Sequence, residues 1–206
     1  MYRSTVNQSN KYEKLVAQGP EVYVGELEKT GWFKGRSETP EEFVNKLKAQ
    51  TADQSFCERL VDFNFFDIDI DGHGDSEDYK DAVTTLLGGT SFPTASVEAN
   101  YNQGKDELSL SVKTTTNHTY KFSFTPFNLE NLELGEVVEK FLNKIIPKEG
   151  IDEQFFSIPE EGSVLAWTVT AKKIYQEFKR RGLVPAADYF IGNQFDGEEE
   201  EDEMGE

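Results

Sequence analysis

Leu108-Ser109-Leu110-Ser111-Val112-Lys113 is the stretch that decides the fold, because apolar and polar residues alternate strictly along it. The same alternation returns in Tyr120-Lys121-Phe122-Ser123-Phe124-Thr125. A period of two is typical of β-strands that bury one face. The intervening Thr116-Asn117-His118-Thr119 indicates a turn, so the two stretches predict a β-hairpin. A third strand is predicted before the hairpin from Val97, Ala99 and Tyr101.

The sequence after the hairpin predicts a helix, two strands and a final helix. The first helix is amphipathic and should stop at Pro147. The strands are expected at Gln154–Ile158 and Val164–Val169, and the last helix at Thr170–Arg181, ended by Gly182. The apolar residues of the first helix are Leu134, Val137, Val138, Phe141, Leu142, Ile145 and Ile146.

The sequence before the hairpin is mostly helical in pattern. Thr39-Pro40-Glu41-Glu42 has the spacing of a capping box with proline in the first turn, and it predicts a helix start. Ser55-Phe56-Cys57-Glu58 repeats that spacing, and Phe56, Leu60 and Phe63 follow at helical intervals. Helical periodicity changes to alternation at the seam Leu87–Pro93.

These elements predict an α+β fold, an antiparallel sheet with helices packed on one face, preceded by a mainly helical N-terminal region. The predicted organisation has three parts. Residues 1–90 form the helical region, residues 91–190 form the α+β domain, and residues 191–206 form a disordered acidic tail.

The net charge of −18 is concentrated in two blocks. Residues 196–206 contain eight acidic residues and no basic one, and residues 53–81 contain ten acidic residues against Arg59 and Lys80. Such a balance argues against direct binding of nucleic acid, whose phosphates would be repelled. It favours a basic protein as the partner. The chain has no stretch of 18 apolar residues and no signal-peptide pattern at its first residues, so we expect a cytoplasmic protein that does not bind membranes.

The acidic block 53–81 contains the one motif that carries chemistry. In Asp67-Ile68-Asp69-Ile70-Asp71-Gly72-His73-Gly74-Asp75-Ser76-Glu77-Asp78, carboxylates occupy alternate positions before a glycine. A hard cation such as Ca²⁺ needs six to eight oxygen ligands, and alternating carboxylates on a curled loop direct several oxygens to one centre.

This motif resembles the EF-hand, a helix, a twelve-residue calcium loop and a second helix, over residues 56–87. The resemblance includes aromatic residues before the loop, Phe63 and Phe66, and an apolar stripe after it, Tyr79, Val83 and Leu86. It implies a site for one Ca²⁺ or Mg²⁺. The implied ligands are Asp67, Asp69, Asp71, the backbone carbonyl of His73, Asp75 and Asp78.

Two positions depart from the EF-hand pattern. Gly74 stands where an aliphatic residue is usual, and the closing residue Asp78 is one methylene shorter than the usual glutamate, which favours Mg²⁺ or weak binding. The alternative interpretation of the segment is an edge strand, in which Ile68 and Ile70 alternate with the acids.

Support for an enzymatic site is poor. His73 and His118 are the only histidines, and the sequence contains no phosphate-binding glycine loop, zinc-binding helix motif or nucleophile elbow. The single Cys57 lies among core residues and is expected to be a buried, inert thiol. Trp32, between glycines and lysine, is expected to be exposed, and Trp167 is expected in the core.

The sequence therefore predicts a non-enzymatic acidic protein that binds a basic protein partner, by analogy with inhibitors and immunity proteins. The same protein is predicted to bind one divalent cation in the loop of residues 67–78. Two alternatives stay open: a calcium-responsive EF-hand module, and an inhibitor that mimics nucleic acid. The second alternative needs a long stripe of carboxylates, whereas this chain has two blocks.

Overall fold

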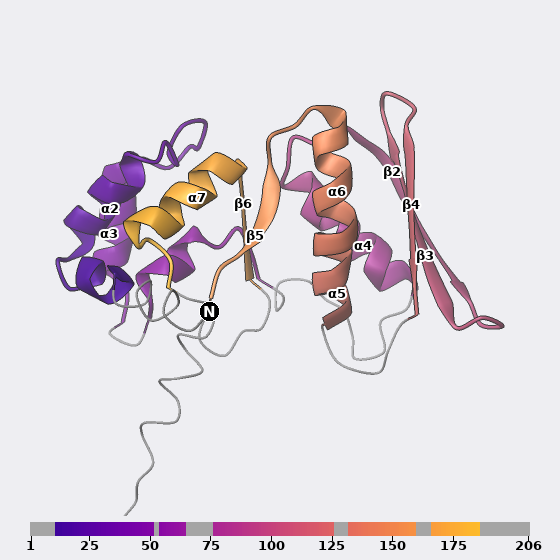
Figure 1. Ribbon diagram of the computed structural model, residues 1–206, viewed down its shortest axis with the longest axis horizontal. Helices are drawn as coiled ribbons and strands as arrows, with labels where there is room; N and C mark the ends of the chain where they lie inside the picture. Colours follow the sequence, from indigo (N-terminus) through magenta and orange to yellow (C-terminus); the bar gives the residue numbers. More distant parts are fainter. Residues whose placement is uncertain (1–10, 52–53, 65–75, 126–131, 160–165, 186–206) are drawn as a thin grey trace, which may run out of the picture. The chain divides into compact units, whose positions relative to one another are not determined.

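The computed structural model describes residues 11–51, 54–64, 76–125, 132–159 and 166–185 (Figure 1). The chain divides into two compact units. The first consists of Met1–Arg59, Pro159–Gly162 and Glu177–Glu206, and the second of Leu60–Ile158 and Ser163–Gln176. The predicted boundary at residue 90 lies inside the second unit, because the segments that complete each core come from distant parts of the chain.

The helices of the first unit pack around aromatic residues. They comprise a helix over residues 11–16, α2 (Pro20–Glu28), α3 (Pro40–Lys48) and the last residues of α7 (Lys172–Arg181). The capping box of α3 is confirmed: the backbone N–H of Thr39 donates to Glu42 Oε2 at 2.8 Å, and that of Glu42 donates to Thr39 Oγ1 at 3.3 Å.

Trp32 is buried in this core, so the expectation that it is exposed is wrong. Its ring meets Phe178 of α7 edge-on with the ring centroids 5.3 Å apart, and the guanidinium of Arg36 covers it at 3.3 Å from the centroid. The glycines that flank Trp32 allow the turn that brings the indole inward, since Gly31 and Gly35 both have positive φ.

The second unit contains the predicted hairpin and third strand, which form an antiparallel sheet of order β2-β3-β4 (Figure 1). The strands are β2 (Thr94–Asn102), β3 (Glu107–Thr114) and β4 (Thr119–Phe124). In the register, Leu110 lies opposite Phe122. Leu108, Leu110 and Val112 are buried, as the alternation predicts.

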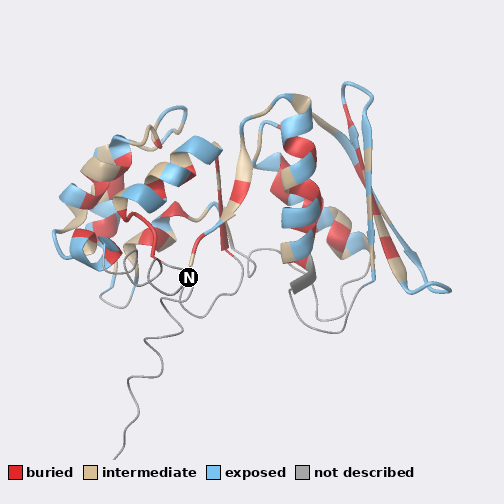
Figure 2. Cartoon of the chain, viewed as in Figure 1, coloured by how far each residue is buried: buried red, intermediate tan, exposed pale blue. Residues whose placement is uncertain are grey.

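Helices cover one face of this sheet, which confirms the α+β class (Figure 1). They are α4 (Ser76–Gly88) and a helix that runs through α5 (Leu132–Val137), the π-helical turn η3 (Val138–Leu142) and α6 (Asn143–Ile145). All seven apolar residues predicted for the second helix are buried. The α-helix ends at Ile145, just before Pro147 as predicted, and Pro147 lies in the 3₁₀ turn η4 (Ile146–Glu149), which is capped by Gly150. Figure 2 shows buried residues along these helices and exposed residues at the turns of the sheet.

The remaining strands make a second antiparallel sheet of order β1-β6-β5. β5 (Gln154–Ser157) and β6 (Ala166–Thr170) occupy the predicted positions, while β1 (Phe63–Asn64) replaces predicted helix. The Phe63 ring packs so closely on Gly89 that a Cβ there would lie 2.1 Å from its Cζ. The glycine at the predicted seam is therefore required for close packing. Every helix that the structure describes is too short or too polar to cross a lipid bilayer.

Candidate functional site

Most of the predicted cation loop lies outside the described residues. This applies to Asp67, Asp69, Asp71, His73 and Asp75. Asp78 is described: it lies half-buried in the first turn of α4. Within the part of the chain that the structure describes, no three His, Cys, Asp or Glu side chains come together in a way that could hold a metal ion.

The residues after the predicted loop form a helix. α4 begins at Ser76, and Tyr79, Val83 and Leu86 are buried along one side of it. Phe124 meets Tyr79 edge-on with the centroids 5.3 Å apart. The acidic residues Glu77 and Asp78 in the first turn are favoured by the positive end of the helix dipole.

The segment before the loop differs from the prediction. The helix expected from Phe56, Leu60 and Phe63 is a five-residue 3₁₀ turn, η1 (Phe56–Leu60), followed by β1. Glu58 does accept from the backbone N–H of Ser55 at 2.9 Å. The Ser55 hydroxyl, however, hydrogen-bonds Tyr12 and Cys57 rather than capping a longer helix, and Phe63 pairs with Trp167 in the sheet.

The solvent side of α4 is acidic. Glu77 and Asp81 are exposed and lie one turn apart, while the opposite side of the helix is in the core. Lys80 forms an ion pair with Glu77, and this hydrogen bond raises the pKa of Lys80 above its usual value. The described end of the acidic block 53–81 therefore presents carboxylates to solvent.

Sequence reasoning missed a cluster of side chains around Glu149. The Glu149 side chain is only 5% exposed. Its Oε1 accepts from Tyr120 at 2.5 Å and lies 2.7 Å from His118 Nδ1, and its Oε2 accepts from Thr116 at 3.1 Å. The hydrogen bond from Tyr120, followed by that from His118, lowers the pKa of Glu149, and the same bond raises the pKa of Tyr120 to about 12.

This cluster has limited chemical capacity. A carboxylate only accepts hydrogen bonds, so a neutral His118 carries its proton on Nδ1 and keeps Nε2 as a proton acceptor. The imidazole is 62% exposed, and both neighbouring hydroxyls, Thr116 and Tyr120, donate to Glu149 rather than standing as nucleophiles. The arrangement fastens the β3–β4 turn to η4. The sequence separation of 31 between His118 and Glu149 explains why no local pattern reveals the cluster.

Cys57 is buried, as expected. Its sulfur donates to the carbonyl of Pro159 at 3.4 Å, and burial raises the pKa of the thiol to about 11. A thiol with so small a thiolate fraction at neutral pH is a poor nucleophile or metal ligand.

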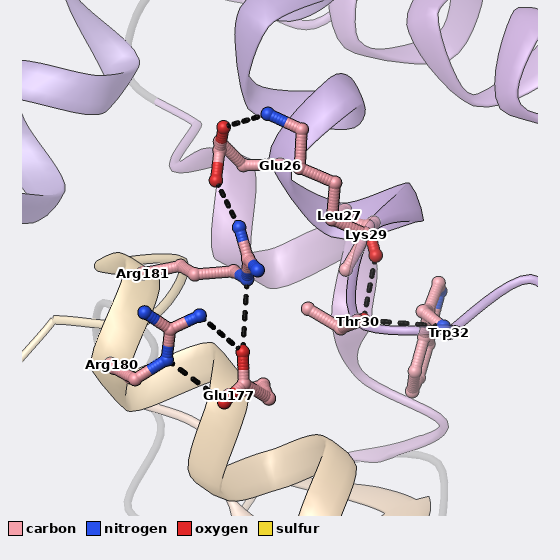
Figure 3. A network of polar contacts seen from close by, with 8 residues as sticks. All are labelled: Glu26, Leu27, Lys29, Thr30, Trp32, Glu177, Arg180 and Arg181. Carbon is pink, nitrogen blue, oxygen red and sulfur yellow. Dashed lines mark hydrogen bonds and ion pairs between the residues drawn. The ribbon is translucent and has the colours of Figure 1, made fainter.

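A network of ion pairs joins α2 to the end of α7 in the first unit (Figure 3). Arg181 Nη1 donates to Glu26 Oε2 at 2.6 Å, and Arg181 Nε donates to Glu177 Oε2 at 3.1 Å. Glu177 also accepts two bonds from Arg180, and these bonds lower the pKa of Glu177 to about 2. The network is structural, since its charges are paired with one another.

Comparisons with protein-family models, with curated proteins and with solved structures found no match to this chain.

Proposed function

We propose that this chain is a non-enzymatic, cytoplasmic protein that binds a basic protein partner through the acidic block 53–81, in the manner of an inhibitor or immunity protein. The observation that carries the proposal is the distribution of charge. Most of the net charge of −18 falls in two short blocks rather than being spread over the chain.

The exposed acids of α4 support this proposal. Glu77 and Asp81 project from a helix whose other side is fixed in the core, so their positions are held by the fold. Concentrated negative charge accelerates encounter with a basic surface, and both the rate and the affinity should fall steeply as salt is added.

The test compares two pairs of substitutions that remove the same charge. Glu77→Gln with Asp81→Asn neutralises the acidic side of α4, and Glu98→Gln with Glu107→Gln neutralises two acids at the β2–β3 hairpin. Binding of a fluorescent lysine-rich peptide is measured by anisotropy at several salt concentrations. Since an exposed ion pair contributes about 0.2–1 kcal/mol, the loss of two should weaken binding about twofold to thirtyfold.

The control pair should leave the affinity for the peptide nearly unchanged. Equal weakening by both pairs would mean that only net charge matters, and it would overturn the assignment of the docking surface to the acidic block 53–81.

A second proposal is that residues 67–78 bind one Ca²⁺ or Mg²⁺. The alternating carboxylates and the buried stripe of α4 support it. Calorimetric titration should give one site per chain, and Asp67→Asn with Asp71→Asn should abolish the heat while Asp106→Asn in the hairpin should not. A ligand that binds the folded state raises the melting temperature. No heat and no shift with either ion at millimolar concentration would dispose of the cation site.

A further inference from the structure

One edge of the sheet β2-β3-β4 is long, nearly uncharged and open. Among the residues that the structure describes, β2 is hydrogen-bonded to a neighbouring strand only on its β3 side. The strand has nine residues, contains neither lysine nor proline, and carries a single charge, at Glu98. Its bulge lies at its start, between Thr94 and Ser96. Edge strands are ordinarily protected by short length, lysine, proline or bulges, because their free N–H and C=O groups can pair with another strand.

Two other sheet edges are protected in these ways. β4 has six residues, and the exposed Lys121 lies near its middle. At the edge of β5, the side chain of Asn143 takes the place of a strand. Its Oδ1 accepts from the backbone N–H of Phe155 at 2.8 Å, and its Nδ2 donates to the carbonyl oxygen of Phe155 at 2.9 Å. β2 has neither kind of protection, so a further strand can be added there.

The alternation of hydrogen bonds shows which groups of β2 face the open side. Successive residues of an antiparallel ladder bond alternately to one side and to the other. The backbone N–H of Thr114 in β3 donates to His118 at 2.9 Å, so the even-numbered residues of β3 bond to β4 and the odd-numbered ones to β2. Odd-numbered residues of β3 lie opposite even-numbered residues of β2. The backbone groups that point to the open side therefore belong to Val97, Ala99 and Tyr101.

The inner side of β2 is covered at one end only. Val97 is 8% exposed, whereas Tyr101, which points to the same side, is 49% exposed. Near its start, α4 reaches across to β4, where Tyr79 packs edge-on against Phe124 with the ring centroids 5.3 Å apart. Phe124 lies opposite Leu108, which in turn lies opposite Tyr101. At the level of Tyr101, α4 is thus withdrawn from the open edge.

Two copies of this edge fit each other. When a twofold axis passes through Ala99, Tyr101 of each copy lies opposite Val97 of the other, so the uncovered end of one edge meets the covered end of its partner. The outward backbone groups then exchange about six hydrogen bonds. On the outer side, Glu98 lies opposite Asn100. An axis at Glu98 would instead place this carboxylate against its own copy, and like charges directly opposite each other are destabilising.

We propose that the chain forms a twofold-symmetric dimer in which the β2 strands of two copies pair antiparallel about Ala99 and join the two sheets into one. The dimer does not use the acidic block 53–81, so it and the binding of a basic partner can fail independently. Each copy carries a net charge of −18, so repulsion weakens the dimer at low salt and added salt strengthens it. This salt dependence is opposite to the one expected for a basic partner.

Analytical ultracentrifugation of the full chain over a range of protein and salt concentrations measures the dissociation constant. Ala99→Pro removes an outward N–H and leaves the N–H groups that bond to β3, so this variant should be monomeric with unchanged circular dichroism. Ser123→Pro is the matched control, because the same alternation directs the N–H of Ser123 to the outer edge of β4. The control variant should dimerise as the unchanged chain does.

Substitutions of Asn100 test the register without altering the backbone. Asn100→Lys would face Glu98 of the other copy at two symmetric positions and should tighten the dimer about twofold to thirtyfold, whereas Asn100→Glu should weaken it by a similar factor. Asn45→Lys and Asn45→Glu change the net charge equally on the exposed side of α3 and serve as controls. Their effects should be smaller.

Three results would overturn the proposal. The first is a chain that stays monomeric at millimolar protein and high salt. The second is a folded Ala99→Pro variant that dimerises as tightly as the unchanged chain. The third is an equal effect of the same charge at positions 45 and 100, because it would show that net charge alone matters and that Glu98 does not face Asn100 across a twofold axis.

Discussion

The substitution Gly182→Ala tests how the first unit is closed. Gly182 follows the last residue of α7 and has φ at +75°. A side chain at this position would point toward the backbone of Lys11. Alanine there would have to adopt the left-handed region, and its Cβ would lie 3.0 Å from the carbonyl carbon of Lys11. Backbone cannot yield as the end of a flexible side chain can, so the helix over residues 11–16 would have to shift.

Gly35 offers a matched control in the same unit. Its φ is +84°, yet nothing lies within 4 Å of a Cβ built on it. The left-handed conformation alone should cost about 1–2 kcal/mol, partly offset by the smaller entropy of the unfolded alanine chain, so Gly35→Ala should lose about 1 kcal/mol. Overpacking adds about 1–3 kcal/mol at Gly182, for a total loss of about 2–4 kcal/mol.

The assay uses the two tryptophans, since Trp32 lies in the first unit and Trp167 in the second. Fluorine NMR of 5-fluorotryptophan protein gives a signal from each during urea unfolding. Gly182→Ala should lower the midpoint of the Trp32 transition well beyond the effect of Gly35→Ala. Equal losses for the two variants would refute the reasoning, because they would show that the contact with Lys11 carries no cost.

Three further predictions concern single side chains. Glu149→Gln should lower the melting temperature most at pH values above 4.5, the usual pKa of the carboxyl group. The pKa of Glu149 is lowered in the folded state, so its ionised form stabilises the fold above pH 4.5, and this stabilisation is lost as the pH falls through the pKa of the folded state. Circular dichroism melts that showed the same difference at every pH would contradict this prediction. Cys57, with its pKa raised from 9.0 to about 11, should react with iodoacetamide at pH 8 about a hundredfold more slowly in the native protein than in urea, and comparable rates would show an accessible thiol. Thr39→Ala should cost about 1 kcal/mol in urea unfolding through loss of the capping box of α3, whereas loss of less than a few tenths would mean that the cap is dispensable.

The elements that sequence predicts well are those whose pattern is local. The alternation in β3 and β4 predicts which of their residues share a face, and Leu110 pairs with Phe122 as a hairpin requires. The amphipathic helix from Leu134 to Ile146 is equally clear, because its apolar period is independent of the rest of the chain. Thr39 and Glu42 lie three residues apart, and their capping box involves no residue from elsewhere in the chain.

Long-range contacts explain the failures. Phe63 fits a helical period, but its strand pairing depends on Trp167, more than a hundred residues later. Trp32 has the neighbours of an exposed residue, yet Phe178 of the last helix provides a partner for its ring. The candidate site follows the same rule: α4 could be predicted from its stripe, whereas the Glu149 cluster depends on a turn and a 3₁₀ segment brought together only by the tertiary structure.

The interleaving of the two units has a consequence for biosynthesis. The first unit takes its opening helices from residues before 60 and the last residues of α7 from the chain after residue 176. A ribosome therefore releases the whole second unit before Phe178 becomes available to cover Trp32. Until then the early helices lack the partner of the Trp32 ring and stay incompletely packed. Folding of the first unit therefore has to wait until α7 has been synthesised, and a nascent chain stalled before residue 172 would have neither unit finished.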